Sequence, residues 1–427
     1  MSLPVLTLEI NDQVYDPSHF AQRYAAFARL GHLRRCAGRR IAACLSDPTE
    51  WLALAFYLRE QGASVAPLHP NTPLEAARRA ARRMRCETLL FEHVEAAVVL
   101  DEVSPPKSEV PALLQMSSGT TGEPKCVERT WASVEEEVIA HGRALGPHAG
   151  LSPLLACPIT HSYGLISGVL SSLARGLRPT VLVNINPKYV IRRALESDGR
   201  LLYASPTLLN VVTRLLSEQR APCAVMTSGA PLPALWFNEL RGRFRQVLQQ
   251  YGCSEVGCIS LATAPDAANE VGAPLDHLQV SAGKDAPSAE EVRVRAGGRE
   301  VLTRDLGFLD GRGLHFLGRM DDTINVAGVN VYPLEVEEVL LEFPGLVEAV
   351  VHKRADPYAG ERVCARFVAR GEIELDALRR HCVARLSPFS VPLEMRQVDE
   401  IPRLENGKVD RRRFASAESA PRAEGIS

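Results

Sequence analysis

The stretch Leu113–Thr130, LLQMSSGTTGEPKCVERT, is the part of this chain from which its architecture can be inferred. Two leucines lead into a run of small hydroxyl-bearing and glycine residues, and Lys125 follows. Glycines let backbone N–H groups turn toward a bound anion, hydroxyl groups add donors, and lysine adds a compact positive charge. The stretch therefore predicts a phosphate-binding loop. Its candidate residues are Ser117, Ser118, Gly119, Thr120, Thr121, Gly122 and Lys125.

The spacing of this loop differs from that of the common P-loop. That motif places four residues between its first glycine and a Gly-Lys pair, which Ser or Thr follows. Here the order is Gly119-x-x-Gly122-x-x-Lys125, followed by Cys126. The run Ser-Ser-Gly-Thr-Thr-Gly-x-Pro-Lys instead resembles the phosphate loop of the adenylate-forming superfamily, which includes acyl- and aryl-CoA ligases, peptide-synthetase adenylation domains and luciferases. A flexible hydroxyl-rich loop is the plain alternative.

Length and composition narrow the possible classes. A chain of 427 residues is too long for one core, so two or three domains are expected. A net charge of −2 and scattered arginines favour neither nucleic acid nor a membrane surface as a partner. The N-terminus lacks a signal-peptide pattern, and no apolar run approaches the roughly 20 residues that span a bilayer, so a cytoplasmic protein without stable membrane insertion is expected. Ten cysteines without a CxxC pair predict reduced thiols rather than zinc ligands or disulfides.

A second candidate motif follows the apolar run 154–157. In the family that the phosphate loop resembles, this position lines the acyl pocket, and amino-acid-activating members have an aspartate where Ser162 stands. A buried ammonium group needs a carboxylate partner, so an α-amino acid is disfavoured. The pattern His-x-Tyr-Gly-Leu resembles aryl and fatty acyl ligases, although for His161 a hydrogen-bonded core histidine is an alternative. The acyl-pocket residues that the resemblance implies are His161, Ser162, Tyr163 and Gly164.

The stretch Val225–Pro231, VMTSGAP, predicts a strand that runs into a turn of small residues. The family lays such a turn against adenine, because no large side chain then blocks the flat base. The resemblance therefore implies adenine contacts at Ser228, Gly229 and Ala230. A plain β-turn is the alternative.

The stretch Gln249–Gly257, QQYGCSEVG, resembles the family's Tyr-Gly-x-Thr/Ser-Glu motif. The resemblance implies that Tyr251 stacks on adenine and that Gly252 allows close backbone approach. It also implies that Ser254 bonds the α-phosphate and that Glu255 holds Mg²⁺, a cation that prefers oxygen ligands.

A ribose site is implied further along the chain. The segment 290–307, EEVRVRAGGREVLTRDLG, predicts a β-hairpin that turns at Gly297-Gly298. Its end resembles the family's Tyr-x-Thr-Gly-Asp signature, with Arg304 in place of the glycine. The resemblance implies that Asp305 accepts both ribose hydroxyls, since a carboxylate can accept two such bonds. The backbone path at Arg304 stays open.

The segment Gly318–Glu338, GRMDDTINVAGVNVYPLEVEE, resembles the family's domain crossover. The resemblance implies that Arg319 bonds the ribose or a phosphate and that Asp321 is the hinge. It also implies that Gly328 lines a pantetheine tunnel after the C-terminal domain rotates. Pro333 is expected to open a helix, as proline does in a first turn.

The segment Pro402–Lys408, PRLENGK, resembles the C-terminal loop that carries the family's catalytic lysine. Asn-Gly is also a tight-turn signal, so a bare hairpin is the alternative. The resemblance extends from Leu58 to Phe414 in a compact variant of the family, in which Cys126 replaces a glycine. It implies an α/β fold: a large N-terminal domain, residues 1–320, with several subdomains of mixed sheets flanked by helices, and a small mobile α+β domain, residues 321–427.

The mechanism that the resemblance implies is attack of a carboxylate on the α-phosphorus of ATP, with loss of pyrophosphate. Lys408, Glu255 and Ser254 carry the catalytic roles, with Mg²⁺ held by Glu255. A thiol of CoA or of the phosphopantetheine on an acyl carrier protein then attacks the acyl-adenylate and takes the acyl group, and AMP leaves. An aryl or fatty acid is expected as substrate, and the acceptor stays open. The alternatives are an amino-acid-adenylating enzyme, a non-catalytic nucleotide-binding module, and a kinase or P-loop NTPase.

Overall fold

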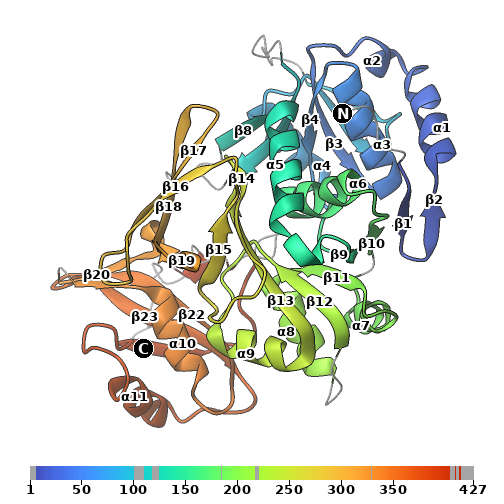
Figure 1. The fold of residues 1–427 in the computed structure, drawn as a ribbon. Coiled ribbons are helices and arrows are strands. Elements are labelled where there is room, and N and C mark those ends of the chain that lie inside the picture. The colour runs from blue at the N-terminus through green and yellow to red at the C-terminus, as the bar shows by residue number, and fades with distance from the viewer. Residues whose placement is uncertain are drawn as a thin grey trace, which may run out of the picture.

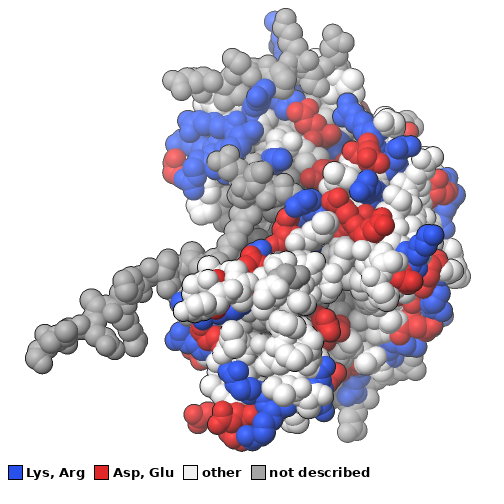
Figure 2. All heavy atoms as spheres, turned by 90° about the vertical axis from the view of Figure 1, so that its left-hand side faces the viewer, with Lys and Arg blue, Asp and Glu red and all other residues white. Residues whose placement is uncertain are grey.

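The computed structural model describes residues 6–100, 110–117, 125–183, 185–216, 221–327, 329–403, 409 and 413–414. Its strands form three sheets, and helices pack against each of them (Figure 1). Over these described ranges, no helix has both the length and the apolar content needed to cross a membrane. The face presented in Figure 2 carries acidic and basic side chains side by side around a broad uncharged area, in keeping with the small net charge.

The first sheet is built from the N-terminal part of the chain and ends in the hairpin β7–β8. Its strand order is β6-β5-β3-β4-β7-β8, in which only the outer strands β6 and β8 run antiparallel to their neighbours. The strands are β3 (Arg40–Leu45), β4 (Ser64–Pro67), β5 (Thr88–Glu92), β6 (Ala97–Val99), β7 (Ala112–Ser117) and β8 (Lys125–Thr130). The helices α3 (Pro48–Glu60) and α4 (Leu74–Arg83) connect parallel strands.

Helix α3 shows why this part of the chain folds locally. Asp47 caps it by accepting from the backbone N–H of Thr49 at 2.8 Å, and Pro48 occupies the first turn. The helix stops before Gly62, which adopts a φ of +73°. Asp47 and Gly62 thus mark the two ends of α3.

The second sheet is the largest, and its order is β16-β17-β18-β19-β15-β14-β13-β12-β11-β9-β10-β1-β2. In this order, the neighbouring strands from β13 to β1 are parallel to one another. The strands on the other side of β13, from β14 to β16, are antiparallel to their neighbours. The strands are β1 (Leu8–Ile10), β2 (Gln13–Tyr15), β9 (Ser152–Ala156), β10 (Thr180–Val181), β11 (Arg200–Ala204), β12 (Ala221–Thr227), β13 (Phe244–Cys253), β14 (Gly257–Ala262), β15 (Glu270–Pro274), β16 (Gln279–Ser281), β17 (Glu290–Ala296), β18 (Arg299–Asp310) and β19 (Gly313–Arg319). The hairpin β17–β18 turns at Gly297-Gly298, as predicted.

The helices lie in layers between and outside these two sheets. Helix α4 packs on one face of the first sheet in a cluster of its own. The main core fills the space between the sheets and includes α3, α5 and η2, and a third cluster packs α7, α8 and α9 on the outer face of the second sheet. The remaining helices of this part are α1 (Pro17–Phe27), α2 (Gly31–Arg34), α5 (Trp131–Ala144), η1 (Gly146–His148), the π-helical η2 (Tyr163–Leu170), α6 (Ser171–Ala174), α7 (Pro187–Leu195), α8 (Pro206–Leu215) and α9 (Ala234–Arg243).

The third sheet belongs to the C-terminal part, which has a separate core. Its order is β21-β20-β23-β22, with β24 paired to β23. Its elements are β20 (Ile324–Val326), β21 (Val329–Val331), α10 (Pro333–Leu341), β22 (Leu346–Asp356), β23 (Gly360–Ala369), α11 (Leu375–Val383) and β24 (Glu394–Gln397), preceded by η3 (Met320–Asp322). Helix α10 lies against α9 and β19, and Arg214 on α8 donates to the carbonyl oxygen of Val347 at 3.5 Å. The expected α/β architecture with a small α+β part is confirmed, including the helix that opens at Pro333.

Candidate active site

The hairpin β7–β8 brackets the predicted phosphate loop. Ser117 and Lys125 are paired at the end of the hairpin next to this loop, and the strands remain in register as far as Thr130. Strand side chains alternate between faces, and Leu114 packs toward α4 while Leu113 joins the main core. Lys125 and Arg129 thus lie on the face of β8 that is directed toward the second sheet. Outside the described residues lie Ser118, Gly119, Thr120, Thr121 and Gly122, and so does the side chain of Ser117.

Cys126 takes the place of a glycine without disturbing that face. Its side chain packs with Met116 against the cluster that contains α4, on the opposite side of the hairpin from Lys125. Burial raises the pKa of the Cys126 thiol, so it stays protonated at neutral pH. The departure from the family pattern is therefore accommodated by packing on the outer side.

Three of the predicted site residues meet where β13, β18 and β19 lie together. The hydroxyl of Tyr251 donates to Oδ2 of Asp305 at 2.7 Å, and Nη1 of Arg319 lies 3.1 Å from Oδ1 of Asp305. Asp305 is buried, and it is the register partner of Arg319 across β18 and β19. Burial, and then the charge of Asp305, hold the pKa of Tyr251 well above its usual value, so this phenol remains a donor. The arrangement fixes the direction of the Asp305 carboxylate.

The turn that carries Ser254 and Glu255 joins β13 to β14. Glu255 is exposed and Ser254 is half-buried. A Cβ at Gly252 would overlap the carbonyl oxygen of Gly257, so the fold itself requires that glycine, whether or not a base approaches it. Gly257 has a φ of +90°, which closes the turn in a conformation that favours glycine.

The turn 228–230 lies next to this site, because it follows strand β12, which is the neighbour of β13. Thr227 at the end of β12 is the register partner of Gln249 on the parallel strand β13. Gly229 has a φ of +88° and is exposed, while Ser228 and Ala230 are half-buried. Loops that follow adjacent parallel strands gather at the same edge of the sheet, where such folds bind ligands.

The segment His161–Gly164 follows β9, which points toward the same edge of the sheet. His161 is exposed, which excludes the alternative of a core histidine. Ser162 donates through Oγ to Oε1 of Gln115 at 2.5 Å and so joins this segment to the strand before the phosphate loop.

The next two residues of this segment serve the packing of η2. The hydroxyl of Tyr163 donates to the carbonyl oxygen of Met226 at 2.6 Å, and its ring is buried in the main core. A Cβ at Gly164 would overlap the carbonyl oxygen of Pro158. The fold therefore accounts for both residue types, and a contact of either one with an acid stays a prediction.

Arg304 adopts the backbone conformation that its glycine counterpart would favour. Its φ is +61°, its N–H donates to Oε1 of Glu291 at 2.9 Å, and its Nη2 donates to Oδ1 of Asp321 at 3.0 Å. Nη2 of Arg319 lies 3.6 Å from the other oxygen of Asp321. The arginine thus keeps the left-handed backbone conformation within β18 and adds an ion pair to the position where the hinge is predicted.

Two predicted residues of the C-terminal part lie outside the described residues. These are Gly328, between β20 and β21, and Lys408, which a bridge between Arg403 and Val409 brackets. The hinge residue Asp321 lies in η3, after the last strand of the second sheet and before the first strand of the third. The roles predicted for these three residues stay predictions.

The donor set fits a magnesium ion that is held mainly by its substrate. Glu255 offers one exposed carboxylate, and among the described residues no three His, Cys, Asp or Glu side chains are grouped to hold a metal by themselves. Mg²⁺ is usually bound by one or two carboxylates together with water and substrate phosphates. Glu255 beside nucleotide phosphates satisfies that pattern.

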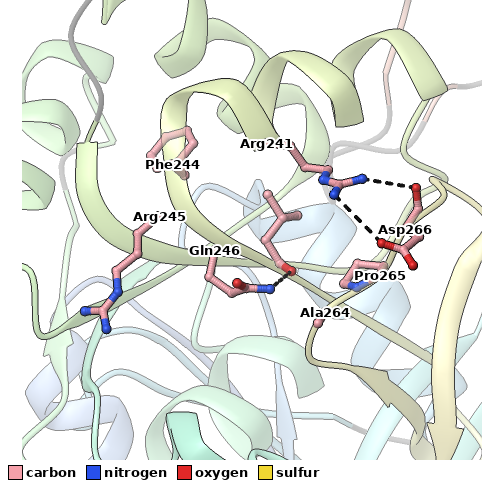
Figure 3. Close-up of a pocket in the computed structure, with 8 residues that line it drawn as sticks. Arg241, Phe244, Arg245, Gln246, Ala264, Pro265 and Asp266 are labelled. Carbon is pink, nitrogen blue, oxygen red and sulfur yellow. Dashed lines mark hydrogen bonds and ion pairs between the residues drawn. The ribbon is translucent and has the colours of Figure 1, made fainter.

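A separate pocket of about 280 Å³ lies at the other end of β13 (Figure 3). Arg241 and Asp266 face each other across it. Gln246 on β13 donates a hydrogen bond to the backbone of the segment 263–266. Phe244 begins β13, whereas Tyr251 lies near its end. This pocket is therefore distinct from the candidate active site.

Comparison with known proteins identifies the class. Residues 92–302 match the family of AMP-binding enzymes, and residues 335–408 match the C-terminal domain of AMP-binding enzymes. A 3,4-dihydroxybenzoate–[aryl-carrier protein] ligase of Bacillus anthracis is 38% identical over 405 residues, which are 95% of this chain and 98% of that protein. A 2-succinylbenzoate–CoA ligase of Bacillus velezensis is 29% identical over 356 residues, 75% of this chain and 70% of that protein.

A solved structure shows the same fold. The o-succinylbenzoate CoA synthetase of Bacillus subtilis, in complex with its acyl-adenylate intermediate, gives a TM-score of 0.82 at 21% identity and covers 99% of this chain and 96% of its own. The chain belongs to the adenylate-forming family of AMP-binding enzymes. It is an AMP-forming acid–thiol ligase, a class that activates carboxylic acids with ATP.

Proposed function

We propose that this ligase activates a hydroxylated aryl carboxylic acid and transfers the acyl group to the phosphopantetheine thiol of an aryl carrier protein. The observation that carries the proposal is the likeness, over nearly the whole of both chains, to a ligase named for 3,4-dihydroxybenzoate and an aryl-carrier protein. The residue at 162 supports it. Ser162 is neutral and bonded to Gln115, so it offers no carboxylate to a substrate ammonium group.

In the first half-reaction, an oxygen of the acid attacks the α-phosphorus of ATP, and pyrophosphate leaves. Asp305, oriented by Tyr251 and Arg319, would accept the ribose hydroxyls, and the turn 228–230 would lie against adenine. Lys125 and the loop before it would hold the outer phosphates, and Ser254 the inner one. These contacts align the two anionic reactants, which is the main demand of phosphoryl chemistry.

Charge must be neutralised while the two anions meet. A bound Mg²⁺ supplies Lewis-acid stabilisation of phosphate oxygens, and Glu255 would hold it. Lys408 would contact both the attacking carboxylate and the α-phosphate. A rotation about Asp321 would then withdraw Lys408 and bring the β20–β21 turn, with Gly328, to the thiol. Such domain movements complete one site after another.

The test is direct detection of the thioester. The purified chain is incubated with ATP, Mg²⁺ and one acid from a panel of 3,4-dihydroxybenzoate, benzoate, a fatty acid and an amino acid. Each mixture receives either CoA or a phosphopantetheinylated aryl carrier protein, and products are weighed by mass spectrometry. We expect an aryl thioester on the carrier protein. Thioesters formed only with the fatty acid or the amino acid, or only on CoA, would overturn the proposal.

A further inference from the structure

A buried ion pair lies directly behind the candidate active site. Nη1 of Arg129 on β8 lies 2.5 Å from Oε2 of Glu137 on α5, and their side chains are 3% and 0% exposed. Two charges removed from water are costly, and apolar side chains of similar size in their place are often as stable or more stable. Stability alone is therefore a weak reason for this pair to be present.

The pair connects three elements at one point. Arg129 also donates through Nη2 to the carbonyl oxygen of Ser133 at 3.2 Å, which fixes the start of α5 to β8. The second oxygen of Glu137 accepts from the backbone N–H of Cys258 at 2.8 Å. Cys258 is the second residue of β14 and pairs with Gly252 across the turn that carries Ser254 and Glu255. The carboxylate of Glu137 thus joins β8 to that turn.

The fit around the pair is tight. A Cβ at Gly257 would overlap both the guanidinium of Arg129 and the carboxylate of Glu137. The backbone of the turn therefore lies so close to the pair that only a glycine fits at 257, where the conformation is left-handed. Movement of the two side chains toward Gly257 would therefore clash with the turn, and movement away would break the bond to Cys258.

The other end of the connection is the phosphate-binding strand. Lys125 and Arg129 lie on the same face of β8, about 13 Å apart along a strand that rises about 3.3 Å per residue. The strand that begins with Lys125 and the turn that holds Glu255 come from parts of the chain more than a hundred residues apart. The ion pair bridges them, because Glu137 bonds both Arg129 on β8 and the N–H of Cys258 just after the turn.

We propose that Arg129 and Glu137 are positioning residues for the first half-reaction, which set the distance between Lys125 and the Ser254–Glu255 turn. The proposal rests on the proposed function, because it assigns both ends to one bound nucleotide. Charged hydrogen bonds are directional, so they fix this distance more closely than apolar packing does. A small misplacement of groups that hold phosphates is costly to the rate even where binding survives.

The test is the double substitution Arg129→Met with Glu137→Leu in the full chain. It removes both charges together, so neither is left buried alone, and it leaves the Cys258 N–H without its acceptor. We expect a modest fall in the melting temperature, because the buried Cys258 N–H loses its acceptor, and a kcat for acid-dependent pyrophosphate exchange on the order of 10²-fold lower. We expect the KM for the acid to be unchanged, and the amide hydrogens of 254–258 to exchange faster with deuterium.

A control is the ion pair Arg193–Glu9, which lies between α7 and β1 and whose side chains are 3% and 14% exposed. Arg193 also pairs with Asp12 and Glu196, whose side chains are 66% and 40% exposed, so water can solvate these two carboxylates in the variant. The double substitution Arg193→Met with Glu9→Leu removes the same charges away from the site. We expect it to leave kcat and the amide exchange of 254–258 unchanged. Equal losses of kcat in both double variants, or wild-type kcat in the Arg129/Glu137 variant, would overturn the proposal.

Arg129→Lys is the second test variant, to be used if the double variant does not fold. Lysine keeps the charge but cannot reach Glu137 and Ser133 together, so we expect a smaller loss of kcat and a smaller rise in amide exchange. Unchanged exchange at 254–258 in this variant would contradict the proposal. The exchange measurement needs no substrate, so it remains informative even if no aryl acid is activated and the proposed function fails.

Discussion

The corner where β8, α5 and β14 meet and the crossover from β19 to β20 are both connected by ion pairs, but the two connections differ in their access to water. At the corner, Arg129 and Glu137 are 3% and 0% exposed. At the crossover, Arg304 and Asp321 are 42% and 33% exposed, and the contact of Asp321 with Arg319 is 3.6 Å long. Water competes for the second set of contacts and not for the first, so the corner is fixed while the crossover contacts can be exchanged at low cost.

This difference fits the chemistry that we propose. Residues on β13, β18 and β19 would hold the nucleotide through both half-reactions, and Lys125 on β8 would hold the outer phosphates in the first. The C-terminal part must first deliver Lys408 and then withdraw it. A fixed corner beside an exchangeable crossover meets both needs.

The largest effect, on the rate of adenylate formation, is expected at Lys408, which the C-terminal part would deliver to the site. Lys408→Ala should reduce adenylate formation by at least about 10²-fold, because it removes one preorganised charge contact in the transition state. The measurement is acid-dependent exchange of labelled pyrophosphate into ATP. The control is Lys188→Ala, which removes an exposed lysine on α7. Near-normal exchange in the Lys408 variant would remove this residue from the mechanism.

The next effect tests whether the crossover must move. Asp321→Pro should leave pyrophosphate exchange largely intact and block thioester formation, because proline fixes φ and restricts the residue before it. The comparison is Asp321→Ala, which loses the same ion pairs but keeps a flexible backbone. We expect thioester formation in the alanine variant. Unchanged overall turnover in the proline variant would contradict a hinge at this position.

A moderate effect on the free energy of unfolding is expected from low pH at a buried histidine near the corner. His141, one turn after Glu137 on α5, bonds Ser171 at 2.9 Å, and burial, followed by the charge of Arg175, lowers its pKa from 6.5 to about 3. The unfolded chain therefore binds a proton that the folded chain excludes between those values, so stability falls as pH falls through that window.

Lowering the pH from 7 to 5 should reduce the free energy of unfolding by about 2 kcal/mol through His141 alone. The measurement is urea denaturation at both pH values, in the wild type and in His141→Gln. The variant should lose less stability between pH 7 and pH 5 than the wild type does. An equal loss in both proteins would show that water reaches His141.

The smallest effect is expected at Arg304. Arg304→Gly removes an ion pair between half-exposed groups, worth up to about 1 kcal/mol, but it also relieves the left-handed conformation of a non-glycine residue. The two changes oppose each other, so the free energy of unfolding should change by less than about 1 kcal/mol. Chemical denaturation measures this. A loss above about 3 kcal/mol would mean that the crossover is as fixed as the corner.

Local signals in the sequence predicted much of the fold. The Gly297-Gly298 turn and the Pro333 start of α10 each depend on a few neighbouring residues, and the structure has both. The order of the motifs predicted the class, and the structure brings Tyr251, Asp305 and Arg319 together as a single site would require.

Features that depend on distant contacts could not be predicted in this way. Arg129 and Glu137 look like ordinary surface charges in sequence, and their partner Cys258 lies more than a hundred residues further on. The resemblance places Gly164 and Gly252 at the ligand, and the structure adds that carbonyl oxygens of the chain itself exclude a side chain at both positions. Periodicity reveals which residues share an element but not which elements meet.

The central claim is that loops far apart in sequence hold one ATP while an aryl carboxylate attacks its α-phosphorus. Exchange of labelled pyrophosphate into ATP, measured with the purified chain and Mg²⁺ in the presence and absence of 3,4-dihydroxybenzoate, tests this most directly. The account predicts rapid exchange only when the acid is present. Release of the γ-phosphate of ATP without any acid, or no exchange with any aryl acid, would contradict it.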